Sequence, residues 1–302
     1  MIDIERILCP VDFSDHSRHA LHYAAVLAGW YESTITVLYV HPVVPAAAAE
    51  PGAPAFPPFV VTAADRDKLL ASMRSLAESD ASADVRVEYE IVEGPAAPGI
   101  LDCASAQRTD LIVMGTHGRS GFERLMLGSV TERVLRKASC PVLTVPPRMH
   151  ESTPVPPLFK KILCAVDFSD CSMNALNFAM SLAQEADAHL TVLNVVELPA
   201  DAHERLPHFS PGVREYLTSL EEEHRQRLQT VVPDSVRAYC AVETMTVPGR
   251  PYREILRVTA EQQADLIVIG IHGRNAADLL FFGSTAQHVV RQATCPVLTL
   301  RR

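Results

Sequence analysis

Two stretches of the chain carry the same motif, each at a predicted strand-to-helix turn. Residues 110–130 read DLIVMGTHGRSGFERLMLGSV, and residues 265–285 read DLIVIGIHGRNAADLLFFGST. Each begins with a short apolar run that is typical of a buried strand. A glycine ends the run, a second follows three residues later, and a third follows ten residues after that, next to a serine. The motif predicts a strand, a loop and a helix start, and the loop either binds phosphate or only makes a turn.

The two stretches belong to a duplication of the whole chain. RILCPVDFSD at 6–15 returns as KILCAVDFSD at 161–170, and each repeated residue lies 155 positions after its counterpart, as Asp167 does after Asp12. CPVLTV and CPVLTL close the two repeats at the same offset. A repeat of this length predicts two domains, at 1–147 and 159–302, joined by a semi-rigid, proline-rich linker at 148–158.

Short apolar runs and helical spacing alternate through each repeat. In the first repeat they predict strands at 7–11, 34–40, 85–92, 111–114 and 142–145, and helices near 20–28, 69–77, 100–107 and 129–137. The second repeat follows the same order. Right-handed crossovers then give an α/β fold, with a five-stranded parallel sheet and helices on both faces in each domain. The proline-rich segment 41–59 interrupts this order and predicts a mobile or functional loop.

Composition restricts the classes of partner. The net charge of −9 and the sequence pI near 5.7 argue against nucleic acid and against an anionic membrane. The first residues lack the basic segment of a signal peptide, and no apolar run approaches the ~18 residues of a membrane span. The seven cysteines form no C-x-x-C pair and are expected to be reduced, mainly buried thiols. We therefore expect a cytoplasmic protein.

The glycine motif lies where a parallel sheet binds its ligands. Ligands bind beyond the carboxyl ends of the strands, at the point where strand order reverses. Glycines in the loop let a ligand approach the backbone, and the serine begins a helix whose free amides favour an anion. The motif is neither a P-loop nor the Rossmann fingerprint, so ordinary turn chemistry remains an alternative. Asp12 and Asp167 end the first strands, where each could bond a base or ribose or could instead cap the next helix.

These residues resemble the universal stress protein family in its tandem two-domain form, and specifically its ATP-binding branch. The resemblance rests on the G-x2-G-x9-G-[ST] motif, the V-D-x-S segment and the C-P-V-L-T ending, and it covers nearly the whole chain. It implies Rossmann-like domains that bind ATP, with or without Mg²⁺. It also implies that the last strands, 142–145 and 297–300, pair as an intramolecular pseudo-dimer, to which a homodimer of chains could be added.

The resemblance also implies two ATP sites. The aspartate and a valine backbone would contact adenine, the first glycine would lie by the ribose, and the later residues would hold phosphates. The implied first site comprises Pro10, Asp12, Val40, Met114, Gly115, Gly118, Arg119, Gly128, Ser129, Val130 and Thr131. The implied second site comprises Asp167, Val195, Ile269, Gly270, Gly273, Arg274, Gly283, Ser284 and Thr285. Ala165 and Ile269 replace Pro10 and Met114 in the second repeat, so joint occupancy of both sites is left open.

Histidines suggest two further hypotheses, and both are disfavoured. His16, His19 and His22 are spaced by three residues, so on a helix they do not share one face. No carboxylate or thiolate is placed to complete a tetrahedral set of zinc ligands, so we expect exposed histidines rather than a zinc site. His117 and His272 repeat inside the glycine loops, where they are expected to shape the loop and face solvent rather than act as acid or base. The acidic triplet at 221–223 is expected on a solvated helical face.

Three classes of function follow. The favoured class is a nucleotide-binding stress or signalling protein that holds ATP without rapid turnover. A slow ATPase is the second, and the loop supplies no lysine for it. The third is an interaction module whose pockets are empty. No catalytic residue is assigned.

Overall fold

The computed structural model describes most of the chain. The described residues are 2–42, 62–78, 85–118, 127–147, 159–197, 210–273 and 282–301. The proline-rich loop beyond Pro42, the linker at 148–158, Arg119 and Arg274 lie outside the described residues.

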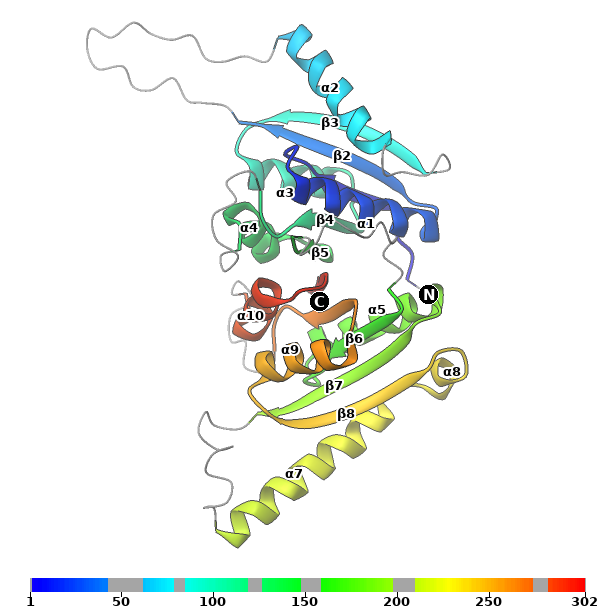
Figure 1. Cartoon of the computed structure of the whole chain (residues 1–302), viewed down its shortest axis with the longest axis vertical. Helices are drawn as coiled ribbons and strands as arrows, with labels where there is room; N and C mark the ends of the chain where they lie inside the picture. Colours follow the sequence, from blue (N-terminus) through cyan, green and yellow to red (C-terminus); the bar gives the residue numbers. More distant parts are fainter. Residues whose placement is uncertain are drawn as a thin grey trace, which may run out of the picture. The chain divides into compact units, whose positions relative to one another are not determined.

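The chain forms two compact units. One comprises residues 3–122 and 128–140, and the other comprises residues 141–302 with the short segments 1–2 and 123–127. Within each unit, helices flank both faces of a mostly parallel sheet, so the predicted α/β class is confirmed (Figure 1). None of the described helices is long and apolar enough to cross a membrane.

The first unit contains four parallel strands in the order β3-β2-β1-β4. The predicted strands differ from the observed ones by at most one residue at each end. The elements are β1 (Arg6–Pro10), α1 (Asp15–Tyr31), β2 (Thr34–His41), α2 (Ala63–Glu78), β3 (Arg86–Glu93), α3 (Ala96–Ala106), β4 (Leu111–Gly115) and α4 (Ser129–Lys137).

The second unit repeats this arrangement and adds the last strand of the first repeat. Its strand order is β5-β10-β9-β6-β7-β8. The elements are β5 (Val142–Val145), β6 (Lys161–Ala165), α5 (Asp170–Ala186), β7 (His189–Glu197), α7 (Pro211–Thr230), α8 (Asp234–Arg237), β8 (Val242–Gly249), α9 (Pro251–Gln262), β9 (Leu266–Gly270), α10 (Ser284–Gln292) and β10 (Val297–Leu300).

The last strands of the two repeats pair antiparallel, with Leu298 opposite Leu143. Thr144 Oγ1 donates to the Val297 carbonyl at 3.1 Å, and Thr299 Oγ1 donates to the Val142 carbonyl at the same distance. Both threonines are buried. The expected pairing of the last strands is therefore confirmed, and equivalent residues make reciprocal bonds across it.

Because the central strands are buried, a ligand can reach them only at the edge of the sheet formed by the strand ends. β4 and β5 are buried along their whole length, as are the apolar residues of β1 and β6. Strands covered on both faces leave only their ends accessible. The strand order reverses between β1 and β4 and between β6 and β9, so the carboxyl ends of these pairs are the predicted binding edges.

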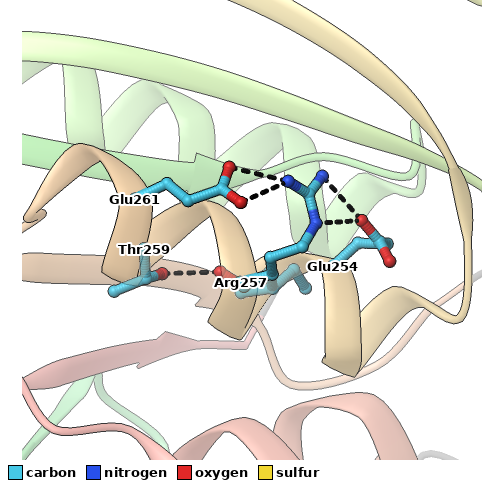
Figure 2. A network of polar contacts seen from close by, with 5 residues as sticks. Glu254, Arg257, Thr259 and Glu261 are labelled. Atoms are coloured by element: carbon cyan, nitrogen blue, oxygen red, sulfur yellow. Dashed lines mark hydrogen bonds and ion pairs between the residues drawn. The ribbon is translucent and has the colours of Figure 1, made fainter.

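Helix α9 begins beside a turn whose backbone conformation favours glycine. Gly249 ends β8 with φ of 152°, and the side chain of Glu254 lies against it. Arg257 bonds Glu254 through Nε at 2.8 Å and Glu261 through Nη1 at 2.6 Å (Figure 2). The hydrogen bonds that Arg257 donates to Glu261 and Glu254 raise the pKa of its guanidinium. This network holds the Glu254 carboxylate towards its own helix, close to the turn.

Candidate functional site

Asp12 organises the turn that follows β1. Its Oδ1 accepts from Ser14 N at 3.1 Å and from Ser14 Oγ at 2.5 Å. Ser14 in turn caps α1 by accepting from Ser17 N. The alternative that Asp12 caps this helix is therefore wrong, because the cap is Ser14 and the carboxylate holds that serine in place.

Asp167 repeats this arrangement in the second half. Its Oδ1 accepts from Ser169 N at 3.0 Å and from Ser169 Oγ at 2.6 Å. Ser169 caps α5 by accepting from Ser172 N. One oxygen of each aspartate is thus committed to the turn. The other oxygen faces the glycine loop.

The glycine loop approaches this second oxygen closely. A β-carbon built on Gly118 would lie 2.7 Å from Asp12 Oδ2, and one on Gly273 would lie 2.6 Å from Asp167 Oδ2. Both distances are shorter than a carbon–oxygen contact allows, so only glycine fits without displacing the carboxylate. Residues more than a hundred positions apart in sequence are therefore brought together.

The first and third glycines also lie in tight places. A β-carbon on Gly115 would lie 3.2 Å from His16 Cβ, and one on Gly270 would lie 2.9 Å from Ser172 N. These glycines let the first turn of α1 or α5 pack against the strand end. Gly128 and Gly283 each donate a backbone bond back into the loop, to Thr116 O and to Ile271 O, both at 2.9 Å. The motif therefore has a packing role besides any role in binding.

Helices α4 and α10 begin without a side-chain cap. Their N-cap residues are Gly128 and Gly283, and neither helix has a side-chain hydrogen bond at its N-cap. The first amides of such a helix have no intrahelical acceptor, and the helix dipole adds positive potential there. This is the arrangement that favours a phosphate. Ser129 and Ser284 occupy the first helical positions and are exposed.

The remaining predicted site residues lie around this edge. Val40 and Val195 are near the ends of β2 and β7. The side chain of Val40 packs against Gly99 of α3: a β-carbon on Gly99 would lie 3.0 Å from Val40 Cγ1. The Thr131 hydroxyl donates to Gly115 O at 2.9 Å, so it ties α4 to β4. Pro10 ends β1, Met114 and Ile269 are buried strand residues, and Val130 and Thr285 are in the first turns of α4 and α10.

The histidines differ from their prediction in burial. His272 is 6% exposed, so the expectation that it faces solvent is wrong. His16 and His117 are half-buried, and their rings lie 5.9 Å apart beside the first glycine loop. His19 and His22 are also half-buried rather than exposed. Within the described ranges, no group of three His, Cys, Asp or Glu side chains is placed to hold a metal.

Sequence reasoning missed the residue that follows each aspartate. Phe13 and Phe168 adopt left-handed backbone angles, with φ of 62° and 64°. A bulky residue in this region is strained and persists only where its surroundings hold it. The shared D-F-S segment at an offset of 155 was the available signal. It did not show that phenylalanine would take a conformation usual for glycine.

A cavity of about 520 Å³ lies elsewhere in the second unit. Its lining includes Lys161 and His189, at the start of β6 and β7, and Gln262 at the end of α9. These positions are at the amino ends of the strands, opposite the edge with the aspartates. The cavity does not coincide with the predicted site.

The fold and the site define a class of protein: an α/β chain with two repeats, each with a carboxylate, a glycine loop and an uncapped helix at the switch point of a parallel sheet. The universal stress protein family matches residues 3–146 and 158–301. The chain belongs to this family and carries its domain twice.

Relatives match one half of the chain or both halves. Universal stress protein MJ0531 of Methanocaldococcus jannaschii is 34% identical over 145 residues, which cover 47% of this chain and 81% of the relative. A universal stress protein of Mycolicibacterium smegmatis is 25% identical over 301 residues, covering 98% of this chain and 96% of the relative. The crystal structure of a universal stress protein from Archaeoglobus fulgidus superposes with a TM-score of 0.64 at 22% identity, over 99% of this chain and 97% of that one. This structural likeness shows the fold.

Proposed function

We propose that the chain binds ATP in each half and acts in stress response or signalling through nucleotide-dependent conformation or partner binding. One observation carries the proposal. In each half, carboxylate oxygen Oδ2 of Asp12 or Asp167 lies against a loop glycine, and the loop leads to a helix with a glycine N-cap. A carboxylate and an anion-binding helix end at one edge suit a ligand with a hydrogen-bonding sugar or base and a phosphate chain.

The proposed pose follows from this geometry. The phosphates would bond the first amides of α4 or α10, with Ser129 or Ser284 adding a hydroxyl. The ribose would lie by Gly115 or Gly270, at the end of β4 or β9. Adenine would contact the backbone of Val40 or Val195 and the aspartate. Any Mg²⁺ would arrive on the phosphates of the nucleotide.

The seven cysteines support the expected location. All are free thiols; Cys140 is partly exposed and the other six are buried. Reduced thiols fit a reducing compartment, so the proposal keeps the cytoplasm as the location.

Nucleotide release and turnover test the proposal. The purified protein is denatured, and the released small molecules are separated by chromatography. Adenine nucleotide at up to two per chain is the expected result, together with a rise in melting temperature when ATP and Mg²⁺ are added to the stripped protein. Steady phosphate release over hours would favour a slow ATPase. Absence of both bound nucleotide and a thermal shift would overturn the proposal in favour of an interaction module.

A further inference from the structure

Helix α7 contacts β7 beside Val195, where the adenine of the second site is proposed to lie. His224 Nδ1 lies 2.8 Å from Asn194 Oδ1, and Asn194 Nδ2 donates to the Val166 carbonyl at 2.8 Å. Because the amide nitrogen of Asn194 faces a carbonyl, its oxygen faces the histidine, and Nδ1 is the donor of that bond. Val166 precedes Asp167. The chain of bonds therefore links α7 to the residue before the site carboxylate.

The same helix holds the strained phenylalanine. The His224 ring meets the Phe168 ring edge-on, with centroids 5.6 Å apart. The Arg227 guanidinium lies 4.2 Å from the centre of the Phe168 ring, within the range of a cation–π contact. Left-handed backbone at a bulky residue is strained and persists only where its surroundings hold it, so contacts that fix the ring also fix the turn. That turn presents Asp167 to the glycine loop.

The first half holds its phenylalanine in a different way. Phe13 has the same backbone conformation, and its ring lies 5.1 Å from the ring of Tyr39 on β2. Tyr39 and Asn194 are equivalent in the repeat, 155 positions apart. The aromatic partner supplied by the strand in the first half is thus replaced in the second half by two side chains from α7.

Helix α7 itself is anchored mainly at one end. Leu228 is buried, whereas Val213 and Tyr216 in the first turns are exposed. The helix packs on β7 and β8 and runs alongside β8 (Figure 1). His224 and Arg227 lie within one turn of Leu228, so docking of the anchored end and clamping of Phe168 occur together.

We propose that His224 and Arg227 are positioning residues of the second nucleotide site, which couple ATP binding in that half to the docking of α7. This inference rests on the proposed function, because it requires that Asp167 contact the nucleotide. Coupling is reciprocal: if docked α7 favours ATP, then ATP favours docked α7. The first half has no part in this coupling, since Tyr39 holds its phenylalanine.

Variants in which only one of the two sites can bind ATP allow the affinity of each half to be measured separately. Gly273→Val disables the second site and leaves the first, and Gly118→Val does the reverse. Calorimetric titration with ATP then gives one dissociation constant for each chain. In the chain with only the second site, Arg227→Ala and His224→Ala should each weaken ATP binding about tenfold, the scale of a lost partly desolvated cation–π contact or buried hydrogen bond. In the chain with only the first site, both substitutions should change the constant less than about twofold.

Controls separate positioning from general damage to the helix. Arg225→Ala removes a neighbouring arginine that pairs with Glu222 on the same helix, and it should leave the second-site constant unchanged. Arg227→Lys keeps a cation over the ring and should restore most of the affinity lost in Arg227→Ala. Hydrogen exchange gives a second readout: ATP should increase amide protection in α7 of the wild-type chain, and Arg227→Ala should abolish that increase.

The outcomes distinguish the two proposals. Suppose that the chain with only the second site binds ATP, and that its Arg227→Ala and His224→Ala variants bind ATP equally tightly. The positioning role is then wrong, while the proposed function stands. If Arg225→Ala weakens binding as much as Arg227→Ala, the effect belongs to the helix as a whole and the inference also falls. If neither single-site chain nor the wild type binds ATP, both proposals are wrong.

Discussion

Gly118 and Asp12 approach each other so closely that a β-carbon on the glycine would lie 2.7 Å from Oδ2 of the aspartate. Gly273 and Asp167 repeat this approach at 2.6 Å. Each aspartate is held from the other side by a serine through Oδ1, so it cannot swing away without losing those bonds. This contact joins the first strand to the glycine loop and makes the site sensitive to a single added methyl group.

We therefore expect Gly118→Ala to abolish ATP binding in the first half and to lower the measured stoichiometry from two to one. Gly273→Ala should do the same in the second half. Gly29→Ala is the control, because this helical glycine has open space around its β-carbon position. It should leave binding intact and stabilise the chain by about 0.5–1 kcal/mol. A stoichiometry of two in Gly118→Ala, measured by calorimetry, would contradict the assignment of the loop.

The capping serines should matter for both stability and binding. Ser14→Ala removes the side-chain cap of α1 and a hydrogen-bond donor to Asp12, so the free energy of unfolding should fall by about 1 kcal/mol and ATP affinity in the first half should fall with it. Ser14→Thr retains the hydroxyl and should retain both. Urea denaturation and calorimetry measure the two effects. A stability loss without any change in affinity would show that Asp12 does not depend on this serine for its position.

Gly94 and Gly249 form a matched pair for backbone strain. Gly94 directly follows edge strand β3, and Gly249 is the last residue of edge strand β8, with φ of 141° and 152°. A β-carbon on Gly94 would meet nothing within 4 Å, whereas one on Gly249 would lie 2.7 Å from Glu254 Cγ, in a side chain that Arg257 holds (Figure 2). Gly94→Ala should cost about 1–3 kcal/mol of unfolding free energy from strain alone, and Gly249→Ala should cost more. Adding Glu254→Ala to Gly249→Ala should reduce the loss to that of Gly94→Ala, and equal losses in the two single variants would refute the steric reasoning.

The paired last strands predict equal effects at equivalent positions. Thr144→Val and Thr299→Val each remove one buried hydroxyl bond across the β5–β10 pair and should each cost about 0.5–1.5 kcal/mol in chemical denaturation. Thr144→Ser keeps the donor and serves as the control for its loss. A Thr144→Val chain as stable as wild type would mean that this hydroxyl does not stabilise the pairing.

Cysteine reactivity should follow burial. Burial raises the pKa of Cys140 to about 11 and that of Cys103 and Cys295 to about 12, and it raises the pKa of Cys9 and Cys164 further. At pH 8 a thiol with a pKa near 11 is only about one part in a thousand thiolate, and this fraction rises tenfold per pH unit. Iodoacetamide should therefore label the folded chain slowly, faster as pH rises, and first at the partly exposed Cys140. Mass spectrometry checks the order; rapid labelling of Cys9 at pH 8 would contradict its burial in the folded state.

Periodicity and repetition in the sequence predicted the order of strands and helices in both halves. The apolar runs at β1 and β4 are each just long enough for one strand, so their assignment was clear. The bounds predicted for α4 agree with those observed. Prediction was less successful where two neighbouring residues are equally good candidates for the same role, such as the N-cap of a helix. Asp12 and Ser14 are both good helix caps, and the choice between them depended on the left-handed turn at Phe13, which has no local sequence signature.

The sequence by itself determined the duplication, the α/β class and the edge at which the glycine loops lie, because these follow from local apolar pattern and from chain connectivity. Only the tertiary structure decided which atoms meet there. It placed Gly118 against Oδ2 of Asp12 and buried His272. It also supplied His224 and Arg227 to Phe168 from a helix whose acidic triplet predicted only a solvated face. These contacts join residues far apart along the chain, and their geometry depends on how helices pack on the finished sheet, which no local pattern encodes.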